Sequence, residues 1–547
     1  MSFRRWFTIC LSILVSVSAI ASADDLHCHA VPAHEPLPAE KAYLDGNTSQ
    51  AETLYREALA KSPHDVALTT GLVRSLLREQ KVGDAAATID AEVALAPTSV
   101  PLLTVSGEVR YRQGKIAEAA GIADQAFRAD PCNARLYLLR ARILRLNSMY
   151  ASERRAIGIA HALDPSDMDI RRTWLGTLPL TQRIDEQKQI LSTSNGMDAE
   201  ERARAEKGLS FLVNRASNLD QTCHVASPTG SAELPFVPIM SEGNSRRIQT
   251  WGLRVAFNNN QTILGVDTGA SGLLINRAIA ERAGLKPMAR FQIGGVGDQG
   301  LQGGYVAHVD SIRVGSLEFR DCIVEVTDRK DILSMDGLIG TDVFSNYLIT
   351  LDFPMRKFLL SPLPPRPTDA GVAPVTLNTE SGDPGASSSS SASGPSAKVQ
   401  DRFISPAMKN YVAFFRSGHD VIIPARLNGK AERLFIVDTG AFSTSISPET
   451  AREVTKVSGN APGAVRGLSG DVAKVQFSEA VLFQFGGIQQ QNNDLYSFDT
   501  TNLSRYAGME ISGLLGSTVL RQLTISIDYR DGLIKFDYDA RHGNHDF

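Results

Sequence analysis

The feature that most constrains the fold of this chain is a tetrapeptide that occurs twice. Asp-Thr-Gly-Ala stands at residues 267–270 and again at residues 438–441. An apolar run directly precedes each copy, at residues 263–266 and 434–437. Such a run before a glycine-containing turn is typical of a buried strand that ends in a tight turn. One Asp alone would be an ordinary turn residue, whereas the pair predicts two carboxylates that act together.

The sequence around the two tetrapeptides is also duplicated, with its landmarks in the same order. A glycine-rich segment follows each Asp, at residues 294–300 and 466–471. A Gly-apolar-apolar-Gly segment then follows at a similar distance from each Asp, at residues 337–340 and 513–516. Short alternating strands with Gly and Asn turns fill both regions. We therefore expect two similar all-β units, each with a glycine-rich hairpin tip that can close over a ligand.

With these residues in view, each β region resembles one lobe of a retropepsin-type aspartic protease. That family carries Asp-Thr/Ser-Gly-Ala, a flap, and a second strand that ends in Gly-φ-φ-Gly, where φ is apolar. The resemblance covers residues 233–362 and 401–547, about half of the chain. It implies an aspartic-type endopeptidase in which Asp267 and Asp438 share one proton and activate a water. It implies no metal and no cofactor.

The resemblance implies supporting roles for the three residues after each acid. A Thr hydroxyl would cross-link the two loops, a Gly would let the chain turn where a side chain would collide, and an Ala would leave room beside the substrate. These residues are Thr268, Gly269, Ala270, Thr439, Gly440 and Ala441. The flap candidates, for which ordinary hairpin turns are the alternative, are Gly295, Val296, Gly297, Gly467, Leu468 and Ser469. Their unequal lengths argue against a symmetric grip on the substrate.

Two alternatives stay open at this point. The first is that the lobes are degenerate and form, with the rest of the chain, a noncatalytic peptide-binding scaffold. Both Asp-Thr-Gly motifs are intact, however, and this favours an enzyme. A lobe that loses activity usually loses its catalytic acid, because an acid is costly to bury. The second alternative concerns assembly. Retroviral enzymes take one Asp from each of two subunits, but this chain carries both, so we expect an intramolecular pseudo-dimer, with a homodimer as the alternative.

A second kind of repeat precedes the β regions. Prolines recur at a constant interval, each after an alanine-rich amphipathic stretch, at Pro63, Pro97, Pro131 and Pro165. This interval is the signature of tetratricopeptide repeats, whose period is about 34 residues. We expect degenerate repeats and further helices over residues 33–217; the alternative fold is a nonrepetitive helical bundle. The repeats would form a concave surface that binds a peptide or protein partner. The alternative role is that the repeats only space or orient the other domains. The expected fold class is multidomain α + β, an α-solenoid followed by two all-β lobes.

The N-terminus carries the features of an export signal. Arg4 and Arg5 precede an apolar stretch and the small residues 21–23. We expect a signal peptide at residues 1–23 and a mature chain from Asp24, with an uncleaved anchor as the alternative. No later stretch approaches the roughly 20 apolar residues that span a bilayer. We therefore expect an exported protein, periplasmic or secreted, whose partner is a polypeptide; the net charge of −4 without a basic stripe does not suggest nucleic acid.

Loss of the signal leaves four cysteines, which allow three disulfide connectivities: Cys28, Cys132, Cys223 and Cys322. The His-Cys-His run at residues 27–29 lacks a second ligand cluster, so we expect a disordered mature N-terminus there rather than a metal site. Residues 363–400 are rich in Pro, Ser and Gly, which predicts a flexible linker. A coil of this length spans roughly 30 Å, so the two lobes can fold back on one another.

Several further polar residues are expected to have structural rather than catalytic roles. Asp342, Asp352 and Asp528 stand at element boundaries, where an acid caps a helix or closes a turn. His224 and His308 are accompanied by no Ser or Cys nucleophile motif. We expect both histidines to be surface or satisfied side chains.

Overall fold

The computed structural model describes residues 28–541, apart from residues 33–34, 194–196, 198, 217–222, 227–229, 242–243, 330–331, 333, 367–400, 431, 461–464 and 494. The expected signal peptide at residues 1–23 and most of the expected linker at residues 363–400 lie outside the described residues. Within the described part of the chain, no helix has the length and apolar character needed to cross a membrane.

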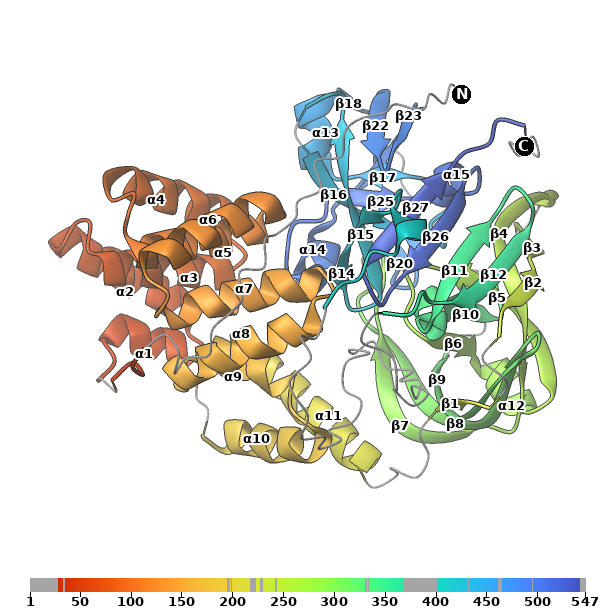
Figure 1. The fold of residues 1–547 in the computed structure, drawn as a ribbon, viewed down its shortest axis with the longest axis horizontal. Coiled ribbons are helices and arrows are strands. Elements are labelled where there is room, and N and C mark those ends of the chain that lie inside the picture. The colour runs from red at the N-terminus through yellow and green to blue at the C-terminus, as the bar shows by residue number, and fades with distance from the viewer. Residues whose placement is uncertain are drawn as a thin grey trace. The chain divides into compact units, whose positions relative to one another are not determined.

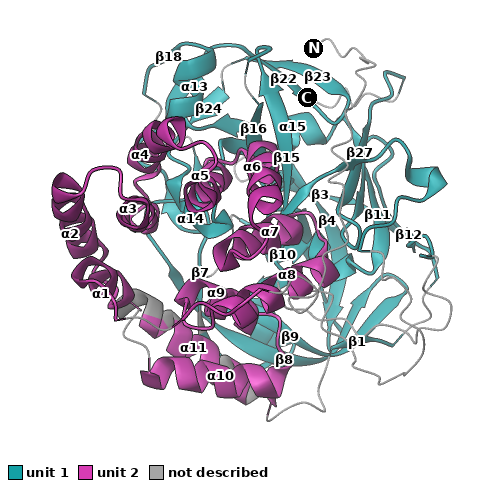
Figure 2. Ribbon diagram, turned by 60° about the vertical axis from the view of Figure 1, so that its left-hand side comes forward, with its two compact units in different colours: residues 1–9, 220–547 teal, residues 10–219 magenta. Residues whose placement is uncertain are grey.

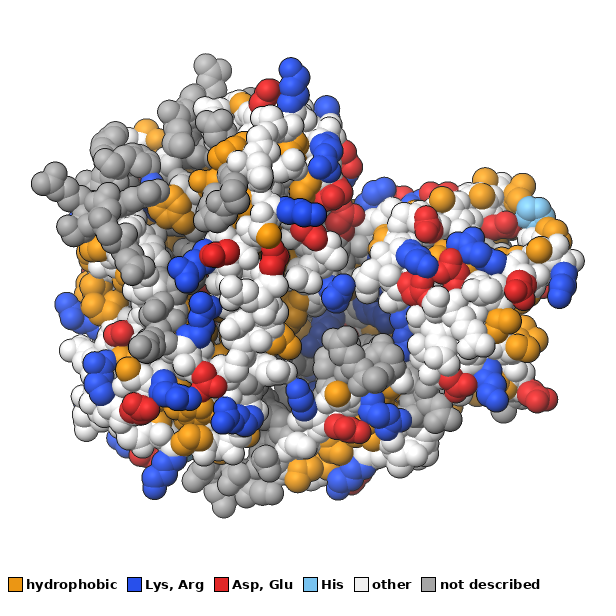
Figure 3. Space-filling view, turned by 180° about the vertical axis from the view of Figure 1, so that it is seen from behind, with side chains coloured by type: hydrophobic (Ala, Val, Ile, Leu, Met, Phe, Trp, Pro, Cys, Tyr) orange, Lys and Arg blue, Asp and Glu red, His pale blue; other side chains and the backbone are white. Residues whose placement is uncertain are grey.

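The chain divides into two compact units, one within residues 10–219 and one within residues 220–547 (Figure 2). The first is built from helices and the second mainly from strands (Figure 1). This order confirms the fold class expected from the sequence. On the face shown in Figure 3, acidic and basic side chains are interspersed over most of the surface.

The described part of the helical unit contains eleven helices. They are α1 (Pro38–Leu44), α2 (Thr48–Lys61), α3 (Val66–Arg78), α4 (Val82–Leu95), α5 (Val100–Arg112), α6 (Ile116–Ala129), α7 (Ala134–Leu146), α8 (Tyr150–Leu163), α9 (Met168–Leu175), α10 (Leu180–Thr193) and α11 (Ala199–Ala216). Helices α2, α4, α6 and α8 begin at the same constant interval as the prolines, and so do α3, α5, α7 and α9. The proline period is thus the period of the helix pairs.

Side-chain caps and a close approach explain where these helices begin and how a pair packs. Asp65, Asn133 and Asp167 occupy the same register in three of the four repeats, and each accepts a first-turn N–H, at 2.9, 3.0 and 2.9 Å; Ser99, in the same register of the other repeat, makes no such bond. A Cβ added at Gly71 would overlap the ring of Tyr55. The small residue in α3 therefore lets α2 and α3 approach closely.

A disulfide between Cys28 and Cys132 ties the beginning of the described chain to the turn before α7. Nearby, Val31 N–H donates a hydrogen bond to the carbonyl oxygen of Leu163 at 2.8 Å. The expectation of a disordered N-terminus at residues 27–29 is therefore wrong for Cys28, because a covalent cross-link holds it; His27 lies outside the described residues. Among the residues that the structure describes, no group of three or more His, Cys, Asp or Glu is placed to hold a metal ion.

The first β lobe is built around a nine-stranded sheet. Its elements are β1 (His224–Val225), β2 (Ala232–Pro235), β3 (Val237–Ser241), β4 (Asn244–Phe257), β5 (Asn260–Asp267), β6 (Leu273–Asn276), α12 (Arg277–Arg282), β7 (Lys286–Ile293), β8 (Gln302–Val314), β9 (Leu317–Thr327), β10 (Gly337–Gly340), η2 (Thr341–Phe344), β11 (Tyr347–Asp352) and β12 (Lys357–Pro362). The Cys223–Cys322 disulfide fastens the start of this lobe to β9.

The second lobe repeats this plan around a ten-stranded sheet. Its elements are η3 (Pro406–Met408), β13 (Val412–Ala413), β14 (Phe415–Ser417), β15 (Asp420–Leu427), β16 (Glu432–Val437), β17 (Ser445–Ile446), α13 (Pro448–Val454), β18 (Val457–Ser458), β19 (Arg466–Gly467), β20 (Gly470–Asp471), β21 (Gln476–Ser478), β22 (Val481–Phe485), β23 (Ile488–Asn492), β24 (Leu495–Ser497), α14 (Thr501–Ala507), β25 (Gly513–Leu515), α15 (Ser517–Leu520), β26 (Thr524–Asp528) and β27 (Leu533–Asp537).

A third sheet joins the two lobes within this unit. Its six strands run in the order β13-β27-β26-β11-β12-β2, so β2, β11 and β12 of the first lobe meet β13, β26 and β27 of the second. At the junction β11 and β26 pair antiparallel, with Ile349 opposite Ile527 and Leu351 opposite Ile525. These four side chains are almost fully buried in a core shared by both lobes. The shared sheet and core fix the two lobes relative to each other.

Candidate active site

Two loops carry the candidate catalytic acids, one at the end of β5 and one directly after β16. The last residues of both strands are buried, because their apolar side chains pack in the core on both faces of the sheet. Each Gly-φ-φ-Gly strand runs parallel beside the strand that bears the acid: Gly340 pairs with Asp267, and Leu515 pairs with Val437. Equivalent strand geometry in the two lobes therefore presents Asp267 and Asp438 at equivalent positions.

The two carboxyl groups lie in hydrogen-bonding contact. Asp267 in its protonated form donates to the carboxylate of Asp438. Gly269 N–H donates to Asp267 Oδ1 at 2.7 Å, and Ala441 N–H donates to Asp438 Oδ1 at 2.8 Å. A Cβ added at Gly269 would stand 3.0 Å from Asp438 Cγ. One added at Gly440 would overlap the Asp267 carboxyl, so the glycines make room for the acid of the opposite lobe.

Burial moves both acids away from ordinary aspartate behaviour. Burial, and then the negative charge of Asp438, raise the pKa of Asp267 well above its usual value. Burial also raises the pKa of Asp438, although the N–H of Ala441 and the hydrogen bond from Asp267 oppose the rise. The pKa of both carboxyls is thus raised, which favours a pair that shares one proton. Such a pair can accept a proton from a water while it donates a hydrogen bond to a carbonyl.

Thr268 and Thr439, both almost fully buried, cross-link the two loops. Thr268 N–H donates to Thr439 Oγ1 at 3.1 Å, and Thr439 N–H donates to Thr268 Oγ1 at 3.0 Å. Each hydroxyl then donates to the carbonyl before the opposite acid, Thr268 to Val437 at 2.6 Å and Thr439 to Val266 at 3.0 Å. Four buried hydrogen bonds thus set the distance between the loops. This is the arrangement that the resemblance implies for these threonines.

The glycine-rich segments form two hairpin tips of unequal length. The first tip, residues 294–301, joins β7 to β8 and contains the candidates Gly295, Val296 and Gly297. The second joins β19 to β20; its candidates are Gly467 at the end of β19 and the two turn residues Leu468 and Ser469. The structure therefore places all six candidates at hairpin tips or next to them.

The two tips are hydrogen-bonded to each other. Ser469 N–H donates to Val296 O at 3.0 Å, and Gln299 N–H donates to Ser469 O at 2.8 Å. Gly297 has a φ of +129°, and a Cβ there would overlap the backbone of Ser469. A glycine is required at this position both for the conformation and for the close approach. The two flap candidates meet as a mutually paired lid.

Leu468 packs against an apolar pocket of the first lobe. Its side chain packs against a buried apolar cluster, and Ala270 of the first catalytic loop packs against the same cluster, which consists of Leu274, Ile293, Ile332, Met335 and Leu338. Arg329 of the first lobe anchors the same tip, because its Nη1 donates to Leu468 O at 2.8 Å. The pocket therefore accepts an apolar side chain next to the catalytic loop.

An acidic side chain shares the sheet face that forms this pocket. Glu325 on β9 pairs with Leu274 on β6, and paired residues on neighbouring strands stand on the same face. Burial, and then the charge of Asp342, raise the pKa of Glu325 to about 7. Glu325 is therefore neutral at acidic pH and becomes charged near neutrality. The sequence analysis did not identify this residue, since no local motif marks it.

Comparisons with known proteins agree with this geometry. Residues 253–346 match the gag-polyprotein aspartyl protease family, and residues 423–519 match the aspartyl protease family. The chain contains two retropepsin-like aspartyl protease domains. Residues 42–100 and 105–167 match the tetratricopeptide repeat. These matches confirm the recognition made from the sequence, retropepsin-like lobes preceded by tetratricopeptide repeats.

Two further comparisons concern whole proteins. Among solved structures, a thermophilic tetratricopeptide repeat protein of Thermus thermophilus is 21% identical over 32% of this chain and 95% of its own, with a TM-score of 0.27. No curated protein matches this chain.

The retropepsin-like lobes also bring together a histidine and an acid that the sequence analysis did not single out. His419, in the turn before β15, places Nε2 3.1 Å from the carbonyl oxygen of Gly269 and 3.3 Å from Asp420 Oδ1. Burial raises the pKa of Asp420 to about 6; the charges of Asp438 and Asp342 add to the rise and His419 opposes it. His419 thus links the second lobe to the first catalytic loop. Its position directly before the strand pair that feeds Asp438 was the available signal.

The three other acids weighed from the sequence close turns or hold loops. Asp342 accepts the backbone N–H of Gly272, 2.9 Å from its Oδ1, next to the first catalytic loop. Asp352 and Asp528 each accept the N–H three residues later, at 3.1 and 3.0 Å. None of these acids hydrogen-bonds to the dyad in the described part of the retropepsin-like lobes.

Two remaining features of the first retropepsin-like lobe involve other residues. His224 and His308 lie on β1 and β8 rather than in the catalytic loops.

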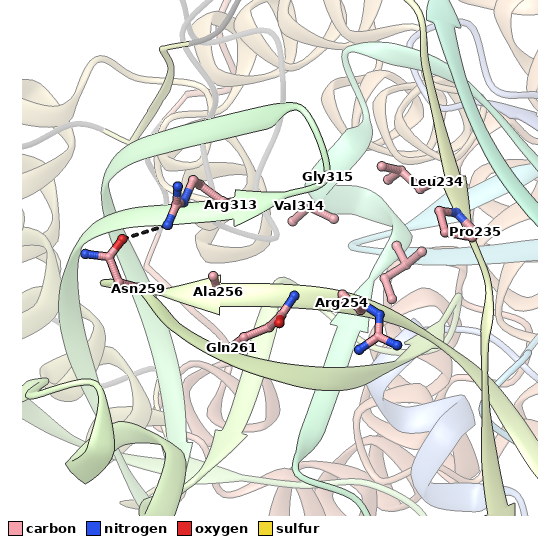
Figure 4. A pocket seen from close by; sticks show the side chains of 10 residues that line it. Leu234, Pro235, Arg254, Ala256, Asn259, Gln261, Arg313, Val314 and Gly315 are labelled. Atoms are coloured by element: carbon pink, nitrogen blue, oxygen red, sulfur yellow. Dashed lines mark hydrogen bonds between the residues drawn. The ribbon is translucent and has the colours of Figure 1, made fainter.

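A hollow of about 400 Å³ is lined by residues of β2, β4, β5 and β8 and the adjoining turns (Figure 4). Arg313 Nη2 donates there to Asn259 Oδ1 at 2.6 Å. No acidic side chain lines this hollow, so it offers no second candidate for a carboxylate pair.

Proposed function

We propose that this protein is an aspartic endopeptidase that hydrolyses peptide bonds with a water activated by Asp267 and Asp438. The observation that carries the proposal is the contact between the two carboxyl groups, which lie together within one chain. The reciprocal bonds of Thr268 and Thr439 support it, because they position both acids without any substrate. The aspartyl protease family matches of both lobes support it independently.

In the proposed reaction the ionised Asp438 removes a proton from a bound water as the protonated Asp267 donates a hydrogen bond to the scissile carbonyl oxygen. The water oxygen bonds to the carbonyl carbon and gives a tetrahedral intermediate. The C–N bond then breaks, and the leaving amine takes a proton from the pair. Each such proton transfer typically contributes about 10²- to 10⁴-fold to the rate. No covalent bond to the protein forms.

The proposed substrate is an extended polypeptide with apolar residues beside the cut. The apolar pocket that holds Leu468 supports this, since a substrate side chain can take the same place when the lid opens. The direct pairing of the flap tips means that the tips must separate before a polypeptide enters. We propose that the tetratricopeptide repeats recruit the substrate or a protein partner.

We propose that the active form is a monomer, because both acids meet within one chain. We also propose that the protein is exported to the periplasm or secreted. The Cys28–Cys132 and Cys223–Cys322 disulfides support export, since disulfides persist mainly in oxidising compartments. Light scattering of the active fraction tests the first statement, and a homodimer that loses activity on dilution would contradict it. N-terminal sequencing of the mature protein tests the second.

The decisive experiment compares three Asp-to-Asn variants on an unfolded protein substrate at mildly acidic pH. Asp267→Asn and Asp438→Asn are each expected to reduce cleavage by at least about 10³-fold, because either change removes half of the pair. Asp310→Asn, at a position with a 78% exposed side chain, is the matched control and should cleave normally. A pepstatin-like transition-state mimic should protect the wild type from thermal unfolding.

The alternative is a noncatalytic peptide-binding scaffold. It predicts that the wild type cleaves no peptide of a library between about pH 3 and 7 while it still binds peptides. That outcome would overturn the endopeptidase proposal.

A further inference from the structure

His419 reaches from the second lobe to the first catalytic loop. Its Nε2 lies 3.1 Å from the carbonyl oxygen of Gly269, a residue 150 positions earlier in the chain. Because a carbonyl oxygen can only accept, Nε2 carries the hydrogen and donates it. The side chain of His419 is 12% exposed, so the bond is largely shielded from water. Such a bond ties the first catalytic loop to the second lobe.

Gly269 is the point at which this bond can act on both acids. Its N–H donates to Asp267 Oδ1 at 2.7 Å. A Cβ added to Gly269 would stand 3.0 Å from Asp438 Cγ, so its backbone also lies directly against the opposite acid. A movement of Gly269 would therefore disturb both carboxyl groups. Misplacement of reacting groups by about 1 Å can lower a rate about 100-fold.

The first lobe carries uncharged residues at the positions equivalent to His419 and Asp420. β4 and β15 each lead into a two-residue hairpin turn of left-handed residues, at 258–259 and 428–429. Counted back from these turns, Gln249 stands where His419 stands, and Thr250 where Asp420 stands. Thr250 Oγ1 lies 3.5 Å from the carbonyl oxygen of Thr439, a longer contact with the opposite loop. The histidine and its neighbouring acid therefore make the surroundings of the two catalytic loops unequal.

Several elements place ionisable groups around His419. Its Nε2 lies 3.3 Å from Asp420 Oδ1, and the Asp420 carboxyl makes no other ion pair or hydrogen bond with a residue that the structure describes. Burial raises the pKa of Asp420, Asp342 and Asp438, and the positive charge of His419 opposes the rise at each of them. The nearby groups are Asp420 of β15, Arg416 of β14, Asp342 of η2, Asp438 of the second catalytic loop and Tyr506 of α14; Glu325 of β9 interacts in turn with Asp342 and Tyr506.

We propose that His419 is a positioning residue of the aspartate pair, which holds Gly269 from the opposite lobe and supplies a positive charge near Asp438. The inference rests on the proposed endopeptidase function, because the proposed reaction needs one acid charged and the other protonated. Histidine is the side chain that typically gains its charge between about pH 5 and 8. In its charged form His419 helps Asp438 to ionise while Asp267 keeps the proton.

The hydrogen bond is tested by comparing His419→Gln with His419→Phe in the full chain. Glutamine can place an amide N–H where Nε2 lies, and Nδ1 meets no hydrogen-bond partner among the residues that the structure describes. Phenylalanine keeps a flat ring but offers no donor. At the optimum pH, kcat of His419→Gln should stay within about threefold of the wild type, whereas kcat of His419→Phe should fall at least about tenfold.

The charge is tested by the acid limb of the kcat/KM profile, which reports the free enzyme. Loss of a nearby positive charge raises the pKa of the acid that must ionise. The acid limb of His419→Gln should therefore move to higher pH by about one unit, so that kcat/KM on the limb falls about tenfold. His308→Gln is the matched control, because His308 also lies near two carboxylates, 3.5 Å from Asp310 and 3.7 Å from Asp321, but on β8. Its profile should coincide with that of the wild type.

Hydrogen exchange followed by mass spectrometry separates this proposal from the endopeptidase. The amides of residues 266–273 should exchange about fivefold faster in His419→Phe than in the wild type, and at nearly the wild-type rate in His419→Gln. Far-UV circular dichroism verifies that both variants fold, and His419→Gln tests the charge by itself if His419→Phe does not fold. Equal exchange in the two variants, or an acid limb of His419→Gln that coincides with that of the wild type, would overturn the proposal. A wild type that cleaves nothing while the two variants differ in exchange would refute only the endopeptidase.

Discussion

Thr268 and Thr439 are 171 residues apart in the chain, yet the backbone N–H of each donates to the hydroxyl oxygen of the other. The same hydroxyls donate to the carbonyls that precede the two acids. Because all these groups are buried, neither threonine can lose its hydroxyl without leaving polar groups of the opposite loop unsatisfied. The catalytic loops therefore depend on each other for their structure.

Thr268→Val is expected to lower the free energy of unfolding of the β unit by about 2–3 kcal/mol, since it keeps the branched shape but leaves a buried N–H and a buried carbonyl unpaired. Proteolytic activity should fall at least about tenfold as the loops lose their spacing. Urea unfolding and peptide cleavage measure the two effects. Thr268→Ser keeps the hydroxyl and should retain most of both, so equal losses in the two variants would contradict the hydrogen-bond explanation.

Gly440→Ala is expected to separate the two carboxyl groups, because the added Cβ would overlap the Asp267 carboxyl. Displacement of the reacting carboxyl groups by about 1 Å should lower kcat by about 100-fold. Gly121→Ala, in the interior of α6 with open space around it, is the control and should raise helix stability by about 0.5–1 kcal/mol. Normal kcat in Gly440→Ala would show that the carboxyl contact does not govern the reaction.

Glu325 provides a prediction about pH. Its pKa in the folded chain, about 7, lies above its ordinary value of 4.5, so the fold favours the neutral form. The stability that this side chain contributes is therefore fully present below about pH 4.5 and is lost as the pH rises through about 7. Glu325→Gln cannot ionise and should unfold with a free energy higher by up to about 3 kcal/mol at about pH 8, and nearly unchanged at about pH 4. Urea unfolding across this pH range measures the free-energy difference between each variant and the wild type. Glu479→Gln, at an exposed position, is the control and should show no difference. A difference in Glu325→Gln that does not change with pH would be inconsistent with the raised pKa.

Leu468→Ala tests the lid. Loss of the side chain from the apolar pocket should weaken lid closure by roughly 1–2 kcal/mol, which corresponds to an acceleration of amide exchange of about tenfold or more at the flap tips. Hydrogen exchange followed by mass spectrometry resolves residues 294–301 and 466–471. Leu301→Ala, at a side chain that is 62% exposed, should leave exchange unchanged. If the flap tips of Leu468→Ala exchanged no faster than those of Leu301→Ala, the pocket would not be what holds the lid closed.

Cys28→Ser is expected to lower the stability of the helical unit by about 3–5 kcal/mol, because the disulfide closes a loop across a sequence separation of 104 residues. Thermal unfolding followed by far-UV circular dichroism measures the loss. Reductant should bring the helical transition of the wild type to that of the variant. If reductant left the unfolding temperature of the wild-type helical unit unchanged, the disulfide would not be what stabilises this unit.

Local sequence patterns were sufficient for the architecture and for the acids. The constant spacing of the prolines predicted helix pairs that recur at the same interval, because a helix pair is defined by residues close in the chain. Each Asp-Thr-Gly-Ala follows an apolar run that forms a buried strand, for the same reason. The expectation at Cys28 failed because its partner lies far away in the sequence.

The sequence by itself determined that two equivalent lobes exist and that each presents one aspartate in a tight turn. Only the tertiary structure decided that Asp267 meets Asp438, that the flap tips pair, and that His419 and Glu325 join the site. These contacts depend on the sheet in which β11 pairs with β26, and on packing between segments more than a hundred residues apart. Local propensity does not encode such pairings, because their free energy arises only when both lobes are folded and share one core.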